Sequence, residues 1–275
     1  MQRVFLTHPE NLCKAVLHGF CLLPVQRYSQ SVIAEDENPK VIQRLIEKLS
    51  QNRPKFDRSQ RVEEGLVYAE LQEALRVAPN IPPPYIGKLC NLLAINNIAD
   101  KALLDILQAH ICQQASQLSH IEVYQVLRFM VEMGVCEARA FSLTKERLMQ
   151  VYTKMDFSGL SHAVKAVAFF EKTNADEGAL RSLFSYLVRI WPKRRVRVTD
   201  VVNIATAARE CSYSDKRLAQ AILKATLVMH SKEKLKSYHA HTIHNALKAV
   251  GFYSKELEDV MLYSSMKGKG IVIFG

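Results

Sequence analysis

The sequence predicts an all-α protein, built as a right-handed α-solenoid of about five helical hairpins. The first observation is a repeat: Leu103, Phe141, Leu180, Leu218 and Leu257 follow one another at spacings of 38, 39, 38 and 39 residues. The second is that the positions fourteen and ten residues before each of them are also apolar. Positions four apart lie on one helical face, so these columns describe a first helix, and the leading column begins a second.

The individual repeats support this hairpin pattern. The junctions "NNIAD", "TNADEG", "SYSD" and "GFYSKE" supply turn and N-cap residues between the two helices. Asp176, Asp215 and Glu256 stand near the start of second helices, where a negative charge suits the helix dipole. The second repeat fits least well, because Lys145 stands where the other repeats have Leu107, Phe184, Ile222 and Met261.

Four segments are expected along the chain. Residues 84–262 form the repeat array. Residues 29–83 contain two helical patterns outside the register, which we expect to cap the array, and the prolines of "PNIPPPY" mark a boundary or a stiff elbow. Residues 263–275 form a basic, β-prone tail that would be disordered or add a strand to a neighbouring protein.

Residues 1–28 are interpreted as a mitochondrial transit peptide. The leader is amphipathic and basic with a single acid, Glu10, and "QRYSQS" resembles a matrix-protease site between Tyr28 and Ser29. This predicts a location in the mitochondrial matrix. The alternative is an ordinary first helix that ends at Pro24. A secretory signal is disfavoured because Lys14 and His18 interrupt the apolar stretch.

Charge is unevenly distributed along the chain. The formal net charge is +10, of which residues 1–155 carry +2 and residues 156–275 carry +8. Such asymmetry favours a polyanion or an acidic protein surface as partner. No apolar run reaches the roughly 18 to 20 residues that a membrane-spanning helix requires, so no membrane span is expected.

No motif for catalysis, a cofactor or a metal is present in the sequence. There is no phosphate-binding G-x-x-x-x-G-K-[ST] loop and no G-x-S-x-G nucleophile elbow, and the six cysteines occur singly, as in a reducing compartment. His239, His241 and His244 could offer two ligands from one helical face, but no Cys or carboxylate partner is nearby. We therefore expect no catalytic residue, no cofactor, no metal and no small-molecule substrate.

Two basic stretches, in "WPKRRVRVTD" and "SKEKLK", occupy the same inter-repeat turn of successive repeats. Each repeat adds two helices, so we expect the turns on one edge, about 20 Å apart. Such an edge suits the phosphates of RNA, with Trp191 or Tyr238 stacking on a base. The alternatives are an acidic protein surface, a solvated edge with Trp191 in the core, and a nuclear localisation signal, against which the leader argues. The candidate phosphate-binding residues are Lys193, Arg194, Arg195, Arg197, Lys232, Lys234 and Lys236, extended by Lys267 and Lys269.

The repeats resemble the heptatricopeptide or FAST-kinase-like repeats of organellar RNA-binding proteins. The segments "DVVNIATAARECSYSDKRLAQAIL" and "HTIHNALKAVGFYSKELEDVML" carry the resemblance, which extends over residues 84–262. The matching residues are Asn203, Ala207 and Tyr213 in one repeat and Asn245, Ala249 and Phe252 in the next.

The resemblance implies a mitochondrial role on RNA, such as ribosomal RNA or mitochondrial transcripts, within a ribonucleoprotein such as the mitoribosome or an RNA-processing complex. Many such proteins carry a C-terminal RAP domain, for which too few residues follow the last repeat, so we expect a binding role without nuclease-like chemistry. The alternative is a scaffold that holds other proteins of a mitochondrial complex, with no direct RNA role.

Overall fold

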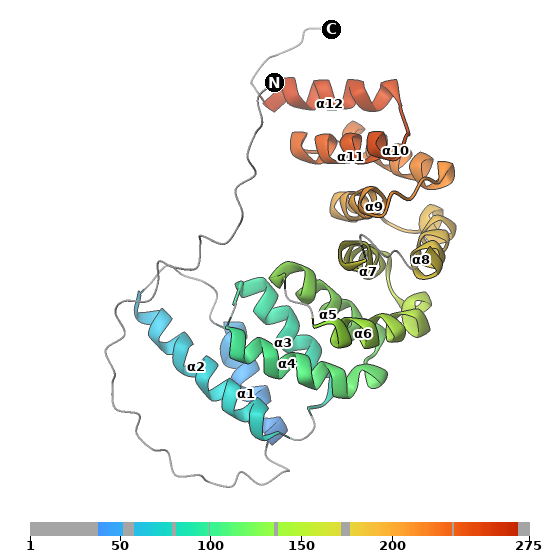
Figure 1. The fold of residues 1–275 in the computed structure, drawn as a ribbon. Helices are drawn as coiled ribbons and strands as arrows, with labels where there is room; N and C mark the ends of the chain where they lie inside the picture. Colours follow the sequence, from blue (N-terminus) through green and yellow to red (C-terminus); the bar gives the residue numbers. More distant parts are fainter. Residues whose placement is uncertain are drawn as a thin grey trace, which may run out of the picture. The chain divides into compact units, whose positions relative to one another are not determined.

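Every regular element that the structure describes is helical. The structure is a computed structural model and describes residues 38–51, 58–78, 81–98, 100–134, 137–171, 177–232 and 234–268. Twelve α-helices and short 3₁₀ helices lie within these ranges (Figure 1). The predicted all-α class is confirmed for them, whereas the predicted targeting segment at 1–28 lies outside the described residues.

The helices follow one another in pairs. The first pair is α1 (Asn38–Gln51) with α2 (Arg58–Val77). The others are α3 (Pro83–Asn96) with α4 (Lys101–Gln114), α5 (His120–Met133) with α6 (Ala138–Val151), α7 (Phe157–Phe170) with α8 (Glu177–Ile190), α9 (Val198–Glu210) with α10 (Lys216–Ser231), and α11 (Ser237–Ala249) with α12 (Lys255–Gly268). The short helices η2 (Ala115–Gln117), η3 (Tyr152–Lys154) and η4 (Trp191–Lys193) precede α5, α7 and α9.

Each first helix packs directly on the first helix of the next pair. Helices α1, α3, α5, α7, α9 and α11 contact one another in that order, and α2 contacts α4, α4 contacts α6, α8 contacts α10 and α10 contacts α12 (Figure 1). The pair α1–α2 therefore packs on α3–α4 in the same way as the later pairs pack on each other. The sequence pattern had left these two helices outside the register.

The apolar columns of the sequence lie in the core. All five members of the column fourteen residues before the leading one are completely buried, namely Leu89, Leu127, Ala166, Ile204 and Ile243. In the column ten residues before it, Val131 and Phe170 are partly buried and pack against the core. Lys145, which breaks the second-helix pattern, is largely buried and forms an ion pair with Glu171 at the C-terminal end of α7. A charged contact thus replaces the apolar contact of the other pairs at this position.

The junctions cap the second helices much as their residue types suggest. The Asp100 and Asp215 carboxylates accept hydrogen bonds from the backbone N–H groups of Leu103 and Leu218, each at 2.8 Å. A cap of this kind typically stabilises a helix by about 1 kcal/mol. Asp176 lies outside the described residues.

At the two ends of the expected array, the structure shows where α3 begins and where α12 ends. The proline run initiates a helix: Pro82 is the N-cap of α3 and Pro83 its first residue, a position that needs no N–H donor. At the other end α12 continues to Gly268, beyond the expected boundary at 262, and Ser264 is buried in it. Among the described helices, none combines the length and the apolar character that crossing a membrane requires.

Candidate nucleic-acid interface

The first basic turn joins α8 to α9 and consists of Lys193, Arg194, Arg195 and Arg197. The chain leaves α8 through η4, continues in extended conformation at Arg194, and enters α9 with Arg197 as its N-cap. The side chains of all four residues are exposed. None of them forms an ion pair with a carboxylate in the part of the chain that the structure describes.

Two buried side chains hold this turn in place. Asp200 is only 1% exposed, and its carboxylate accepts the backbone N–H of Arg197 at 2.9 Å, while the Ser161 hydroxyl of α7 lies 3.2 Å from its other oxygen. Trp191 is 8% exposed and packs edge-to-face on Phe157, with 5.0 Å between the ring centroids. Trp191 thus belongs to the core, and its ring is covered where a base would have to stack.

The second basic turn joins α10 to α11 and consists of Lys232, Lys234 and Lys236. The Lys234 N–H donates to the Met229 carbonyl at 3.0 Å, which closes the C-terminus of α10, and Lys236 is the N-cap of α11. All three lysine side chains are exposed. Glu233, which lies between them in sequence and offsets one of their charges, is outside the described residues.

The two basic turns lead into two helices that pack on each other. Helices α9 and α11 pack on each other, and each begins at one basic turn. Their far ends also meet, because the Ser214 hydroxyl donates to the Val250 carbonyl at 3.1 Å. The N-terminal ends of α9 and α11, which follow the two basic turns, therefore lie on the same side of this helix pair. We call the seven cations of the two turns the basic edge.

The direct contact between α9 and α11 does not support the assumption behind the expected spacing of about 20 Å between the turns. That expectation assumed that the second helix of a pair separates successive first helices. Since α9 contacts α11 directly, the relevant spacing is that of two packed helices, about 8–10 Å.

The earlier inter-pair turns carry less positive charge. The turn between α4 and α5, at Ala115–Gln117, contains no charged residue, and the turn between α6 and α7 contains Lys154 followed by Asp156. Towards the C-terminus, Lys267 lies in α12, although its side chain is outside the described part, and Lys269 is outside it altogether. Within the described residues, clusters of positive charge thus occur in two successive inter-pair turns.

Tyr238, the other residue expected to stack on a base, is exposed beside the second basic turn. Its side chain is 60% exposed, and its ring lies 3.9 Å, centroid to centroid, from that of His239. Burial, and then the charge of Lys236, holds the pKa of His239 below its ordinary value. His239 therefore stays neutral near pH 7, and the positive charge of this turn comes from its lysines.

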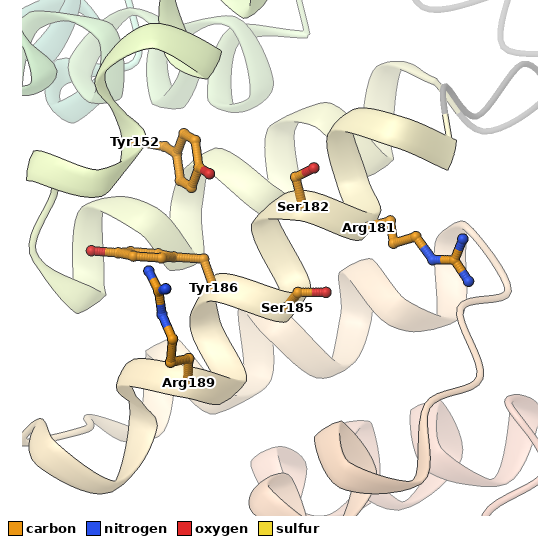
Figure 2. A pocket seen from close by; sticks show the side chains of 6 residues that line it. All are labelled: Tyr152, Arg181, Ser182, Ser185, Tyr186 and Arg189. Atoms are coloured by element: carbon orange, nitrogen blue, oxygen red, sulfur yellow. The ribbon is translucent and has the colours of Figure 1, made fainter.

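A shallow pocket on α8 was missed by the sequence interpretation. It has a volume of about 450 Å³ and is lined by Tyr152 of η3 and by five residues of α8, namely Arg181, Ser182, Ser185, Tyr186 and Arg189 (Figure 2). The Tyr152 and Tyr186 rings meet edge-to-face, with 5.2 Å between centroids, and the Arg189 guanidinium lies 4.9 Å from the Tyr186 ring centroid. In the sequence, this pocket was indicated only by the helical spacing of its five α8 residues, which places them on one face of that helix.

His162 lies in α7, one residue after the serine that contacts Asp200. Burial, followed by the positive charges of Arg128 and Lys165, lowers its pKa below the ordinary value of 6.5. Asp200 and Glu132 act in the opposite direction but do not outweigh these effects. His162 is therefore neutral in the folded protein at pH 7.

The remaining candidate ligands do not gather into a metal site. Within the described ranges, no three His, Cys, Asp or Glu side chains meet in a way that could hold a metal ion. His239, His241 and His244 all lie on α11. Burial raises the pKa of the thiols of Cys90, Cys112 and Cys211.

No protein-family model matches the sequence, and no curated protein matches it.

Proposed function

We propose that this chain is a non-catalytic helical-repeat protein that binds RNA through the basic edge. The observation that carries the proposal is the placement of seven exposed cations, free of described carboxylate partners, in two neighbouring turns. Arg and Lys at such positions neutralise phosphates, and this contact supplies most of the sequence-independent affinity for nucleic acids. The paired helices form an α-solenoid in this proposal, with the basic turns along one of its edges.

The cellular setting is part of the same proposal. The basic, acid-poor leader supports a mitochondrial location, and the resemblance of the last two pairs to organellar RNA-binding repeats supports a role within a mitochondrial ribonucleoprotein. Ribosomal RNA and mitochondrial transcripts are the RNA classes proposed.

The test is RNA binding by a charge-reversed variant of the full chain. Arg194→Glu, Arg195→Glu, Lys232→Glu and Lys234→Glu are combined, and binding to a labelled single-stranded RNA is followed by fluorescence anisotropy. We expect a loss of at least 100-fold, because four attractive contacts become repulsive. The matched control reverses Lys88 and Lys101, which are exposed on α3 and α4, and should bind RNA like the wild type. Equal affinities of the test variant and the wild type would refute the proposal.

A protein scaffold is the second candidate function. Exposed apolar side chains at the last pair favour it: Tyr253 is 70% exposed, Leu262 51% and Tyr263 47%. Affinity purification from nuclease-treated mitochondria separates the two functions. Partner proteins that stay bound after RNA is digested support the scaffold, and partners that are lost were bridged by RNA.

A further inference from the structure

We propose that the pocket on α8 binds one unpaired nucleotide of the RNA strand that contacts the basic edge. This inference rests on the proposed function and adds a site to it. At about 450 Å³ the pocket falls within the usual size range of small-ligand pockets. Its lining combines aromatic rings, hydroxyls and guanidinium groups, which are the groups that bind the base, the sugar and the phosphate of a nucleotide.

Tyr152 is the side chain on which the base stacks. The Tyr186 hydroxyl donates to the Thr153 carbonyl at 2.8 Å, and its ring lies between Tyr152 on one face and Arg189 on the other (Figure 2). Tyr186 is thereby fixed, with both faces in use. The Tyr152 ring lines the pocket and is only partly buried, so part of its surface is open to a base.

The two arginines bind phosphates on either side of that base. Arg181 and Arg189 are eight residues apart on one helix, about 12 Å along its axis, and so present two cations along the length of a bound strand. Neither forms an ion pair with an acidic side chain among the described residues, and the residues that line the pocket include no carboxylate. Ser182 and Ser185 lie between the two arginines and offer hydroxyl oxygens to the ribose (Figure 2).

The pocket and the first basic turn are adjacent along the chain. Helix α8 ends at Ile190, one residue beyond Arg189, and η4 leads from there directly into the first basic turn. A strand bound at Lys193 and Arg194 therefore reaches Arg189 within a few nucleotides. Stacking on Tyr152 requires an accessible base face, which an unpaired nucleotide offers and a base in a duplex does not.

The first experiment removes the stacking ring in the full chain. Affinity for a labelled single-stranded RNA and for a duplex RNA of equal length is measured by anisotropy. Tyr152→Leu keeps apolar volume without a π-face and should weaken single-strand binding roughly 5- to 10-fold, with unchanged affinity for the duplex. Its salt dependence should stay unchanged, whereas Arg189→Gln should reduce the log–log salt slope by about 0.7. Tyr253→Leu, at a tyrosine in the turn between α11 and α12, is the matched control and should bind like the wild type.

A second variant leaves the packing of the two tyrosines intact. Ser182 is exposed, so Ser182→Glu places a negative charge in the pocket without removing a ring. It should weaken single-strand binding at least 5-fold, while Ser116→Glu, at an exposed serine in the neutral turn between α4 and α5, should have no effect. Ultraviolet crosslinking of the wild-type complex, followed by peptide mass spectrometry, should place a crosslink at Tyr152.

The outcomes separate this inference from the proposed function. If the Tyr152 and Ser182 variants bind single-stranded RNA like the wild type while charge reversal of the basic edge abolishes binding, the pocket proposal is wrong and the proposed function stands. If the wild-type chain binds no RNA, both are wrong. Tyr152-dependent binding of a polyglutamate peptide, with RNA affinity unchanged, would show that the pocket takes an acidic protein segment instead.

Discussion

The salt dependence of RNA affinity should report how many cations of the basic edge contact phosphates. Each phosphate that a cation neutralises on a single strand contributes about −0.7 to the slope of log K against log salt concentration. If all seven cations of the two basic turns make such contacts, they should together contribute about −5 to the slope, to which Arg181 and Arg189 of the pocket would each add about −0.7. The contacts of these seven cations alone should then lower the RNA affinity roughly 10³-fold between 50 and 200 mM salt.

Neutralising one turn at a time tests whether both turns bind the same strand. Replacing the four cations of the first basic turn with Gln should reduce the magnitude of the slope by about 3, and replacing the three of the second should reduce it by about 2. Gln keeps the length and polarity of the side chains, and all seven are exposed, so folding stability should change by less than about 0.5 kcal/mol.

The assay is anisotropy with a labelled single-stranded RNA at five or more salt concentrations. Lys88→Gln with Lys101→Gln is the control, and its slope should equal that of the wild type. A wild-type slope near zero, or a turn variant whose slope equals that of the wild type, would contradict phosphate binding by both basic turns. If only one of the two turn variants changes the slope, the two basic turns do not bind the same strand.

Three further predictions concern the folded framework. Stability should fall as the pH drops from 7.5 to 5.5, because the depressed pKa of His162 keeps it neutral in the folded protein while the unfolded chain takes up a proton near pH 6.5; urea unfolding at each pH should show a weaker dependence in His162→Gln. Gly87→Ala should cost about 1–3 kcal/mol in thermal unfolding, since the new Cβ would lie 2.9 Å from Cγ and 3.3 Å from Cα of Glu122 on the neighbouring helix α5, and an unchanged midpoint would contradict this. Trp191→Ala should lose about 3–5 kcal/mol, whereas Tyr238→Ala should change stability by less than about 0.5 kcal/mol; equal losses would show that the burial of Trp191 contributes little.

The helices from α3 to α12 were predictable because their apolar residues recur with helical periodicity and their junctions carry capping residues. The place of α1 and α2 was not predictable, because it depends on which surfaces pack together, and the segment that joins them does not keep the register of the later pairs. Lys145 looked like a mismatch for a related reason: its partner Glu171 lies on the next pair, beyond any local pattern.

The candidate site, too, could be predicted from the sequence only in part. The basic turns were visible in the sequence because charges cluster along the chain, but their spacing depended on α9 packing directly on α11. The pocket on α8 was not visible, because Tyr152 comes from the pair before α8 and meets Tyr186 only through packing. Only the α8 side chains could have been found, as polar and aromatic residues at helical spacing.

The anchors of the first basic turn and its cations have separable roles. Asp200 and Trp191 are buried and determine the path of the turn, whereas its four cations are exposed and contribute little to folding. Substitution of an anchor should therefore change stability and RNA affinity together, while substitution of a cation should change affinity alone. This difference follows from burial, so a cation variant that loses stability as well would show that the turn contributes to the fold rather than presenting charge to a ligand.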